Sequence, residues 1–123
     1  MSPKKRDASA CVIGGLLETL TRPWTMHILW VLGHIGPMRF GVLKKQVAGI
    51  SSRVLTQRLR TLEEKGFVFR HYEPTIPPAV TYGITARMKD MEKVFAQLEA
   101  MARKWEHDES ATHHAHERPM AHV

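Results

Sequence analysis

Residues 51–66, SSRVLTQRLRTLEEKG, have the pattern of an amphipathic helix with a cap at each end. Three leucines recur at helical spacing, which places them on one side of the helix: Leu55, Leu59 and Leu62. Ser51 is a favourable N-cap, because its hydroxyl can accept a hydrogen bond from an unpaired amide of the first turn. Gly66 suits the left-handed position that follows a helix. The segment therefore predicts a helix over residues 52–65 with one buried side.

The opposite side of this helix carries side chains that can donate hydrogen bonds to base edges. Arginine can donate two hydrogen bonds to guanine, and glutamine can pair bidentately with adenine. We expect base readout by Ser52, Arg53, Thr56, Gln57 and Arg60. A helix N-terminus and flanking cations hold phosphates. We expect phosphate contacts from Arg39, Lys44, Lys45, Ser51, Arg58 and Arg70.

The segments around this helix predict a winged helix-turn-helix. A short helix at about 41–47 precedes it, and two strand-like segments, 67–73 and 80–84, follow it around a proline-rich loop. A short helix, a turn, a second helix and a hairpin in this order are typical of that motif. The loop at 73–78 contains no cation, so we expect its tip to make only a weak, mostly steric contact with DNA.

Another helix is expected upstream, beginning at residues 21–24. Pro23 suits its first turn, where a missing amide proton is no loss. Gly33 and the pair Gly36-Pro37 are expected to end it, and residues 38–40 form a tight connection. The apolar side of this helix consists of Trp24, Ile28, Val31, Leu32 and Ile35.

Apolar stripes at both ends of the chain predict two more helices, which we expect to join two subunits. The first covers residues 9–20, and the second is capped by Thr85 and ends at about Glu106. From Met88 to Trp105 the second stripe follows a seven-residue repeat, as in a coiled coil. The expected dimerisation residues are Ile13, Leu16, Leu17, Leu20, Met91, Phe95, Leu98, Ala102 and Trp105.

The predicted fold class is α+β and mostly α: a winged helix-turn-helix with a two-stranded wing and flanking N- and C-terminal dimerisation helices. Residues 1–8 are expected to be a flexible basic arm, residues 9–106 the folded domain, and residues 107–123 a disordered, His-rich tail. No apolar run is long enough to span a bilayer, and no signal peptide is recognisable. We therefore expect a cytoplasmic protein.

The positive charge is concentrated in the middle of the 123-residue chain. Residues 22–70 contain nine Lys/Arg and two Glu, a net charge of +7, whereas residues 71–123 contain six Lys/Arg and eight Asp/Glu, a net charge of −2. A local positive field attracts polyanions such as nucleic acid. The predicted helix-turn-helix lies within this basic part of the chain.

Enzymatic activity is not expected, because the chain has no paired carboxylates, nucleophile elbow, phosphate loop or His-Glu-x-x-His pattern. The single cysteine, Cys11, excludes a disulfide within one chain. The histidines of the C-terminal tail have no regular spacing, so we expect no metal site and no cofactor. Basic residues at 4–6 and a helix N-terminus would favour the reactive thiolate of Cys11; the alternative is a small apolar residue that packs under the first helix.

Over about residues 10–105 the chain resembles the HxlR-type winged-helix regulators of bacteria and archaea, which are relatives of the MarR group. The positions that carry the resemblance are Cys11, Trp24-Thr25, Ile28-Leu29, Arg39-Phe40, Gly49-Ile50-Ser51, 55–59 (LTQRL), Leu62-Glu63, Gly66-Phe67-Val68, Pro77-Pro78, Tyr82 and Thr85. The chain departs from the family at Pro23, where a lysine or arginine is usual, and at Met88, where a glycine is usual.

This resemblance implies a homodimer joined through the first and last helices, with residues 51–65 as the recognition helix. Some similar proteins sense oxidants or electrophiles through a cysteine at the place of Cys11. We therefore expect a transcriptional regulator that binds an inverted-repeat operator in double-stranded DNA, with a redox or electrophile response through Cys11 as a hypothesis. The alternatives are a winged-helix module that binds protein, and a ligand or metal sensor that binds DNA only secondarily.

Overall fold

The computed structural model describes residues 8–116, and it divides at residue 90 into two compact units. The first unit contains α1 (Ala8–Leu20), α2 (Thr25–Ile35), β1 (Met38–Arg39), α3 (Phe40–Gln46), α4 (Ser52–Glu64), β2 (Val68–Glu73) and β3 (Ala79–Ile84). A short 3-10 helix, η2 (Arg87–Asp90), then leads into α5 (Met91–His116), which makes up the second unit. None of the helices in this part of the chain is long and apolar enough to cross a membrane.

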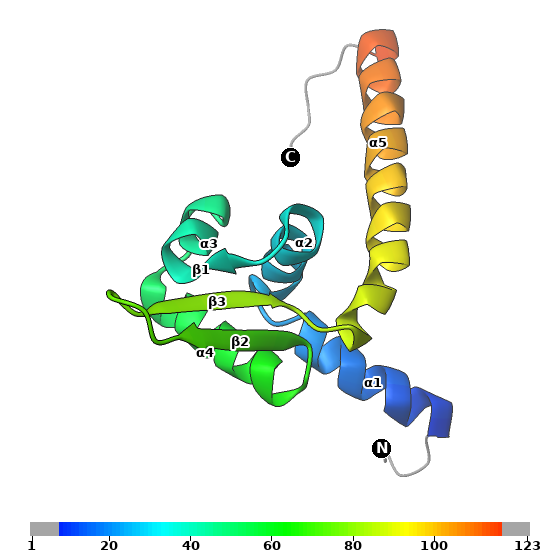
Figure 1. Ribbon diagram of the computed structural model, residues 1–123. Helices are drawn as coiled ribbons and strands as arrows, with labels where there is room; N and C mark the ends of the chain where they lie inside the picture. Colours follow the sequence, from blue (N-terminus) through cyan, green and yellow to red (C-terminus); the bar gives the residue numbers. More distant parts are fainter. Residues whose placement is uncertain (1–7, 117–123) are drawn as a thin grey trace. The chain divides into compact units, whose positions relative to one another are not determined.

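The three strands form one antiparallel sheet in the order β1-β3-β2 (Figure 1). β2 and β3 are the two strands of the predicted wing, and they pair over their whole length, from Val68 opposite Ile84 to Glu73 opposite Ala79. β1 is a third strand that the sequence did not reveal. Residues 38–39 were predicted to be a tight connection, but Met38 pairs with Tyr82 and Arg39 with Thr81.

The core of the first unit lies between α2, α3, α4 and the sheet. The three leucines of α4 are almost completely buried, with Leu55 at 0%, Leu62 at 1% and Leu59 at 2% exposure. Burial of a leucine contributes roughly 1.5–3 kcal/mol, so these side chains fix which side of α4 faces outward. The other fully buried large side chains are Ile28, Leu29, Leu32, Leu43, Val47 and Val68.

The two caps predicted for α4 are confirmed. The Ser51 hydroxyl oxygen accepts a hydrogen bond from the Val54 amide at 3.1 Å. At the other end Gly66 has a φ of 78°, in the left-handed region that favours glycine. The Phe67 amide donates to the Leu62 carbonyl at 2.9 Å and the Gly66 amide to the Glu63 carbonyl at 3.0 Å, which is a Schellman arrangement. The helix therefore has the predicted start and ends at Glu64, with Lys65 as its C-cap.

Loss of the Ser51 cap will lower the free energy of unfolding by about 1 kcal/mol, because the Val54 amide then has no partner in the chain. Urea unfolding of Ser51→Ala at a fixed protein concentration measures this change. Ser52→Ala is the matched control, since Ser52 is exposed and begins the helix proper. Equal stability of the two variants would contradict the capping role.

Several predicted boundaries are wrong for physical reasons. α2 begins at Thr25, not at residues 21–24, because Trp24 takes a left-handed φ of 75° and Pro23 precedes the cap. Gly33 lies inside α2, where its Cα faces the Ile84 side chain, and only Gly36 follows the helix end. Trp24 and Ile35 were predicted to be on the buried side but are 36% and 55% exposed.

The C-terminal helix also differs from its prediction. The Thr85 hydroxyl accepts a hydrogen bond from the Met88 amide and so caps η2 rather than α5. α5 continues to His116, beyond the predicted end at Glu106, because residues 107–116 contain no glycine or proline to stop it. The prediction of disorder from residue 107 is therefore wrong as far as residue 116. Of the predicted arm at 1–8, Ala8 begins α1 and residues 1–7 lie outside the described residues, as does the last part of the tail, 117–123.

Candidate nucleic-acid interface

The outward side of α4 carries the strongest hydrogen-bond donors of the predicted base-reading set. Arg53, Gln57 and Arg60 are all exposed, and their spacing places them on one side of the helix, opposite the buried leucines. Among residues 12–110, whose side chains the structure describes, no side-chain hydrogen bond or ion pair engages these three residues. Two guanidinium groups and one amide are thus presented to solvent with their donors unused.

Thr56 and Ser52, also predicted to read bases, can make fewer hydrogen bonds to a base than the arginines and the glutamine. Thr56 is half-buried, and its hydroxyl donates a hydrogen bond to the Ser52 carbonyl at 2.8 Å. That hydroxyl can therefore only accept a further hydrogen bond, and the methyl group is left for apolar contact. The Ser52 side chain is exposed in the first turn of α4, next to the cap. These residues flank the arginine and glutamine side chains but offer fewer donors.

The N-terminal end of α4 is where anion binding is most favourable. The first amides of a helix have no partner inside it, and the helix dipole is positive at that end. Ser51 is exposed here, and although its oxygen caps Val54, its hydroxyl proton remains available to a phosphate. The tip of the β2–β3 hairpin lies at this same end of the first unit (Figure 1). The helix start and the wing tip are therefore on one side of the molecule.

The cations predicted to bind phosphate do not all face the same way. In the sheet, Arg39 shares a row with Thr81 and His71, whereas Arg70 lies in the next row with Tyr82 and Met38. Neighbouring rows point to opposite faces of a sheet. Arg70 is thus on the face of the buried Met38, toward the helices, and Arg39 is on the other face. In α3, Lys45 is exposed and Lys44 is half-buried, both in the last turn.

Arg58 has a role that the sequence did not reveal. Its Nε donates a hydrogen bond to the Pro23 carbonyl at 2.8 Å, so the side chain ties α4 to the turn between α1 and α2. The two residues are far apart in sequence, and no local pattern predicts such a contact. This hydrogen bond helps to hold α4 in place and uses only Nε, so a phosphate contact by the Nη groups of Arg58 stays a prediction.

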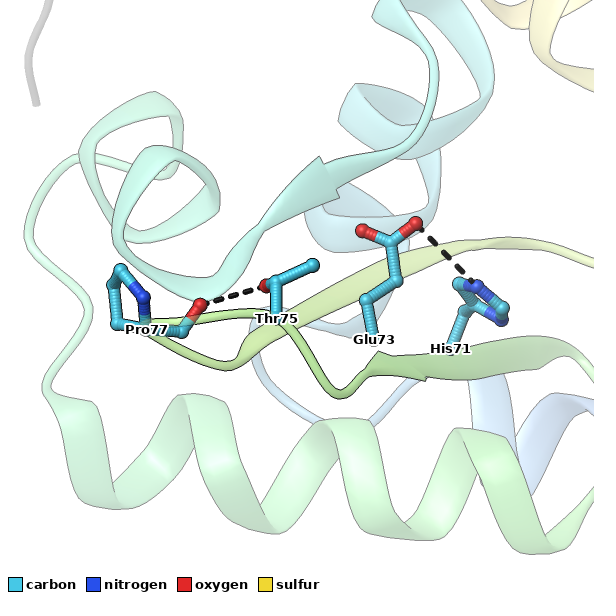
Figure 2. Close-up of polar contacts among 4 residues, drawn as sticks. All are labelled: His71, Glu73, Thr75 and Pro77. Atoms are coloured by element: carbon cyan, nitrogen blue, oxygen red, sulfur yellow. Dashed lines mark hydrogen bonds and ion pairs between the residues drawn. The ribbon is translucent and has the colours of Figure 1, made fainter.

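The wing contributes little positive charge. The His71 Nε2 and a Glu73 carboxylate oxygen are 3.8 Å apart, and Figure 2 shows the two side chains turned toward each other from β2. Beyond them, the Thr75 hydroxyl donates to the Pro77 carbonyl at 2.7 Å. At the tip, Ile76 is 99% exposed. The loop thus presents apolar and uncharged groups, and Glu73 disfavours a close phosphate.

The helices predicted to join subunits have exposed apolar sides. In α1, Val12, Ile13, Leu16 and Leu17 are exposed, whereas Leu20 is buried in its own subunit and is not available to a partner. In α5, the large exposed apolar side chains are Val94, Leu98, Met101 and Trp105; Ala102 is exposed beside them, and Met91 and Phe95 are half-buried. Val94 and Met101 were not among the predicted dimerisation residues, because they widen the apolar stripe and do not continue its repeat.

Two remaining predictions concern groups that could react or bind metal. Cys11 lies in α1, but its side chain is outside the described ones. No group of three or more His, Cys, Asp or Glu side chains that could hold a metal ion occurs among the residues that the structure describes.

The comparisons with known proteins agree with this arrangement. A family model described as HxlR-like helix-turn-helix matches residues 19–110. An uncharacterised HTH-type transcriptional regulator of Synechocystis sp. is 34% identical over 100 residues, which cover 81% of this chain and 73% of that protein.

Solved structures of similar fold include a protein described as a MarR-family transcriptional regulator from Enterococcus faecalis, with a TM-score of 0.71, 26% identity, and coverage of 90% of this chain and 99% of that one. The reduced form of the transcriptional regulator YodB from Bacillus subtilis has a TM-score of 0.66 and 29% identity, over 83% of this chain and 91% of its own. YodB has also been solved with quinone bound and after diamide treatment. The chain is a winged helix-turn-helix protein and belongs to the HxlR-like helix-turn-helix family of transcriptional regulators.

Proposed function

We propose that this regulator binds double-stranded DNA as a homodimer and reads base edges in the major groove with α4. The observation that carries the proposal is the exposed side of α4, where Arg53, Gln57 and Arg60 have unused donors opposite three buried leucines. A major groove about 12 Å wide admits one α-helix and distinguishes all four base pairs. The cytoplasm is the location that this role requires.

The phosphate contacts that we propose surround this helix. Ser51 and the first amides of α4 hold one phosphate, while Lys44 and Lys45 reach the backbone from the end of α3. Arg70 contributes from the sheet face that points toward the helices. Arg39, on the opposite face, is the weakest member of this set. Such contacts position the protein without reading sequence.

The apolar surfaces that a single chain leaves exposed support the proposed homodimer. Leu98, Met101 and Trp105 recur along α5 at coiled-coil spacing, and each is at least 40% exposed. A second copy of the same helix covers such a stripe, with α1 adding Ile13, Leu16 and Leu17. Two-fold symmetry then gives an inverted-repeat operator with half-sites about 34 Å apart, or a multiple of that distance.

Selection of binding sites from random duplex DNA tests this function. We expect enrichment of an inverted repeat, and an affinity for it that falls steeply as salt rises, because bound phosphates release counterions. No enrichment at moderate salt would contradict the proposal. That outcome would favour the alternatives: a winged-helix module that binds an acidic protein, or a ligand or metal sensor for which DNA is secondary.

A response to oxidants or electrophiles through Cys11 is a further part of the proposal. It is supported by the place of Cys11 near the start of α1 and by the similarity to YodB, which has been solved in reduced, diamide-treated and quinone-bound forms. We expect a quinone to modify Cys11 faster than it modifies a free cysteine at the same pH, and DNA affinity to fall as it does so. Mass spectrometry and DNA binding measure the two effects. Modification at the rate of free cysteine, or unchanged DNA affinity, would contradict a sensor role.

A further inference from the structure

The last turn of α4 contains no cation, and the first basic residue at this end is the C-cap, Lys65. Its last turn contains Glu63 and Glu64 and no basic residue, although the helix dipole is negative at that end. Each acidic residue there is unfavourable by roughly 0.3–1 kcal/mol. A further positive charge near this end would therefore stabilise the recognition helix.

The segment between β3 and α5 supplies such a charge. The Arg87 guanidinium donates a hydrogen bond from Nη1 to the Lys65 carbonyl at 3.3 Å. Its Cζ lies 5.3 Å from the centroid of the Phe67 ring, which is a cation–π contact. The same Nη1 would be 3.2 Å from a Cβ built on Gly66, so the guanidinium covers the left-handed residue that follows the helix. Arg87 thus adds a second positive charge at the end of α4, beside that of Lys65.

Thr85 makes a second connection to the same place. Its hydroxyl donates to the Gly66 carbonyl at 2.7 Å, and its amide donates to the Phe67 carbonyl at 3.1 Å. The Thr85 hydroxyl oxygen also accepts the Met88 amide at 3.3 Å, which starts η2. Thr85 therefore holds the turn that follows the recognition helix and caps η2, which leads into α5.

We propose that Thr85 and Arg87, together the Arg87 clasp, position α4 for base readout and connect it to the start of the dimerisation helix. Arg87 is a positioning residue: it fixes the C-terminal end of α4 from the side opposite the DNA-facing N-terminus. This inference rests on the proposed function, because it concerns how accurately α4 enters the groove.

The test uses the full-length dimer with two variants at Arg87 and a control. Arg87→Met removes the charge and the hydrogen bond but keeps a long side chain on Phe67, Arg87→Lys keeps the charge, and Lys89→Met removes an exposed cation from the same 3-10 helix. Two probes are used: the duplex that the wild type selects from random DNA, and a shuffled duplex of the same composition. Hydrogen exchange at the Gly66 and Phe67 amides reports on the end of α4.

We expect Arg87→Met to bind the selected duplex about tenfold more weakly, because a hydrogen bond from a charged group is lost, while the shuffled duplex changes less than about twofold. Arg87→Lys should restore part of the loss, and Lys89→Met should match the wild type. Exchange at Gly66 and Phe67 should quicken most in Arg87→Met, less in Arg87→Lys, and not in Lys89→Met.

Equal losses on both duplexes in Arg87→Met would overturn the inference, because they would make Arg87 a plain phosphate contact. An unchanged ratio of the affinities for the selected and the shuffled duplex, or unchanged hydrogen exchange at the Gly66 and Phe67 amides, would also overturn it. If Arg87→Met proves unstable by circular dichroism, Arg87→Lys decides alone, and wild-type selectivity together with wild-type exchange in that variant overturns the inference. A wild type that prefers no duplex would instead defeat the proposed function, and the exchange measurement would still test the clasp.

Discussion

Replacement of both Arg53 and Arg60 with alanine will lower the affinity for the selected duplex by about a thousandfold. A good bidentate contact between an arginine and a guanine contributes roughly 1–3 kcal/mol of discrimination. Two arginines on each of two subunits make four such contacts. Even at the lower limit, their loss is about 4 kcal/mol, which is about three powers of ten in affinity. Both side chains are exposed, so the free energy of unfolding should change little.

Fluorescence anisotropy with the selected and the shuffled duplex measures this effect. The charge-matched control is the double variant Lys44→Ala, Lys45→Ala, which removes two cations from α3. We expect the control to weaken both duplexes alike and to reduce the dependence of affinity on salt, because phosphate contacts are independent of sequence. If the arginine variant also weakens both duplexes equally, the assignment of base readout to this side of α4 is wrong.

Introduction of a glutamate at Leu98 will produce a monomer that binds the selected inverted repeat about a thousandfold more weakly. Leu98 lies in the apolar stripe of α5 and is 44% exposed in a single chain. In the proposed dimer, two such glutamates would be desolvated close to each other, at a cost of several kcal/mol. Two linked DNA-binding units bind with an affinity roughly 10²–10⁴ times that of one unit, and the monomer loses this increase.

Sedimentation equilibrium and DNA binding together measure the change produced by Leu98→Glu. Ala100→Glu is the matched control, because it adds the same charge at an exposed position of α5 that is away from the stripe. We expect the control to remain a dimer with wild-type affinity. A wild type that is monomeric at micromolar concentration, or a Leu98→Glu variant that is still dimeric, would contradict the role of α5.

The sequence was sufficient to predict the recognition helix because the decisive information there is local. The spacing of Leu55, Leu59 and Leu62 selects the buried side, and Ser51 and Gly66 act on amides and carbonyls within a few residues. The wing was predicted for the same reason: two β-rich segments enclose prolines that cannot join a helix. The confirmed parts of the fold all depend on such short-range patterns.

The features that sequence reasoning missed depend on contacts between distant segments. β1 has only two residues, so it is a strand because β3 lies beside it and not because of its own composition. Arg58 reaches Pro23 across 35 positions, and Arg87 reaches Lys65 across 22. A side chain that stabilises the far end of another helix leaves no periodic pattern. The opposite orientations of Arg39 and Arg70 likewise follow only from the register of the sheet.

Substitution of single purines in the selected duplex by 7-deazapurines tests the major-groove role of α4 most directly. The substitution removes one major-groove acceptor, N7, and leaves Watson–Crick pairing intact. We predict that the wild type loses about tenfold in affinity at one or more purines of each half-site. At those purines Arg53→Ala or Arg60→Ala should lose nothing further, since the partner of the missing acceptor is already absent. Equal losses in the wild type and both variants, or no loss at any purine, would show that Arg53 and Arg60 do not read N7 in the groove.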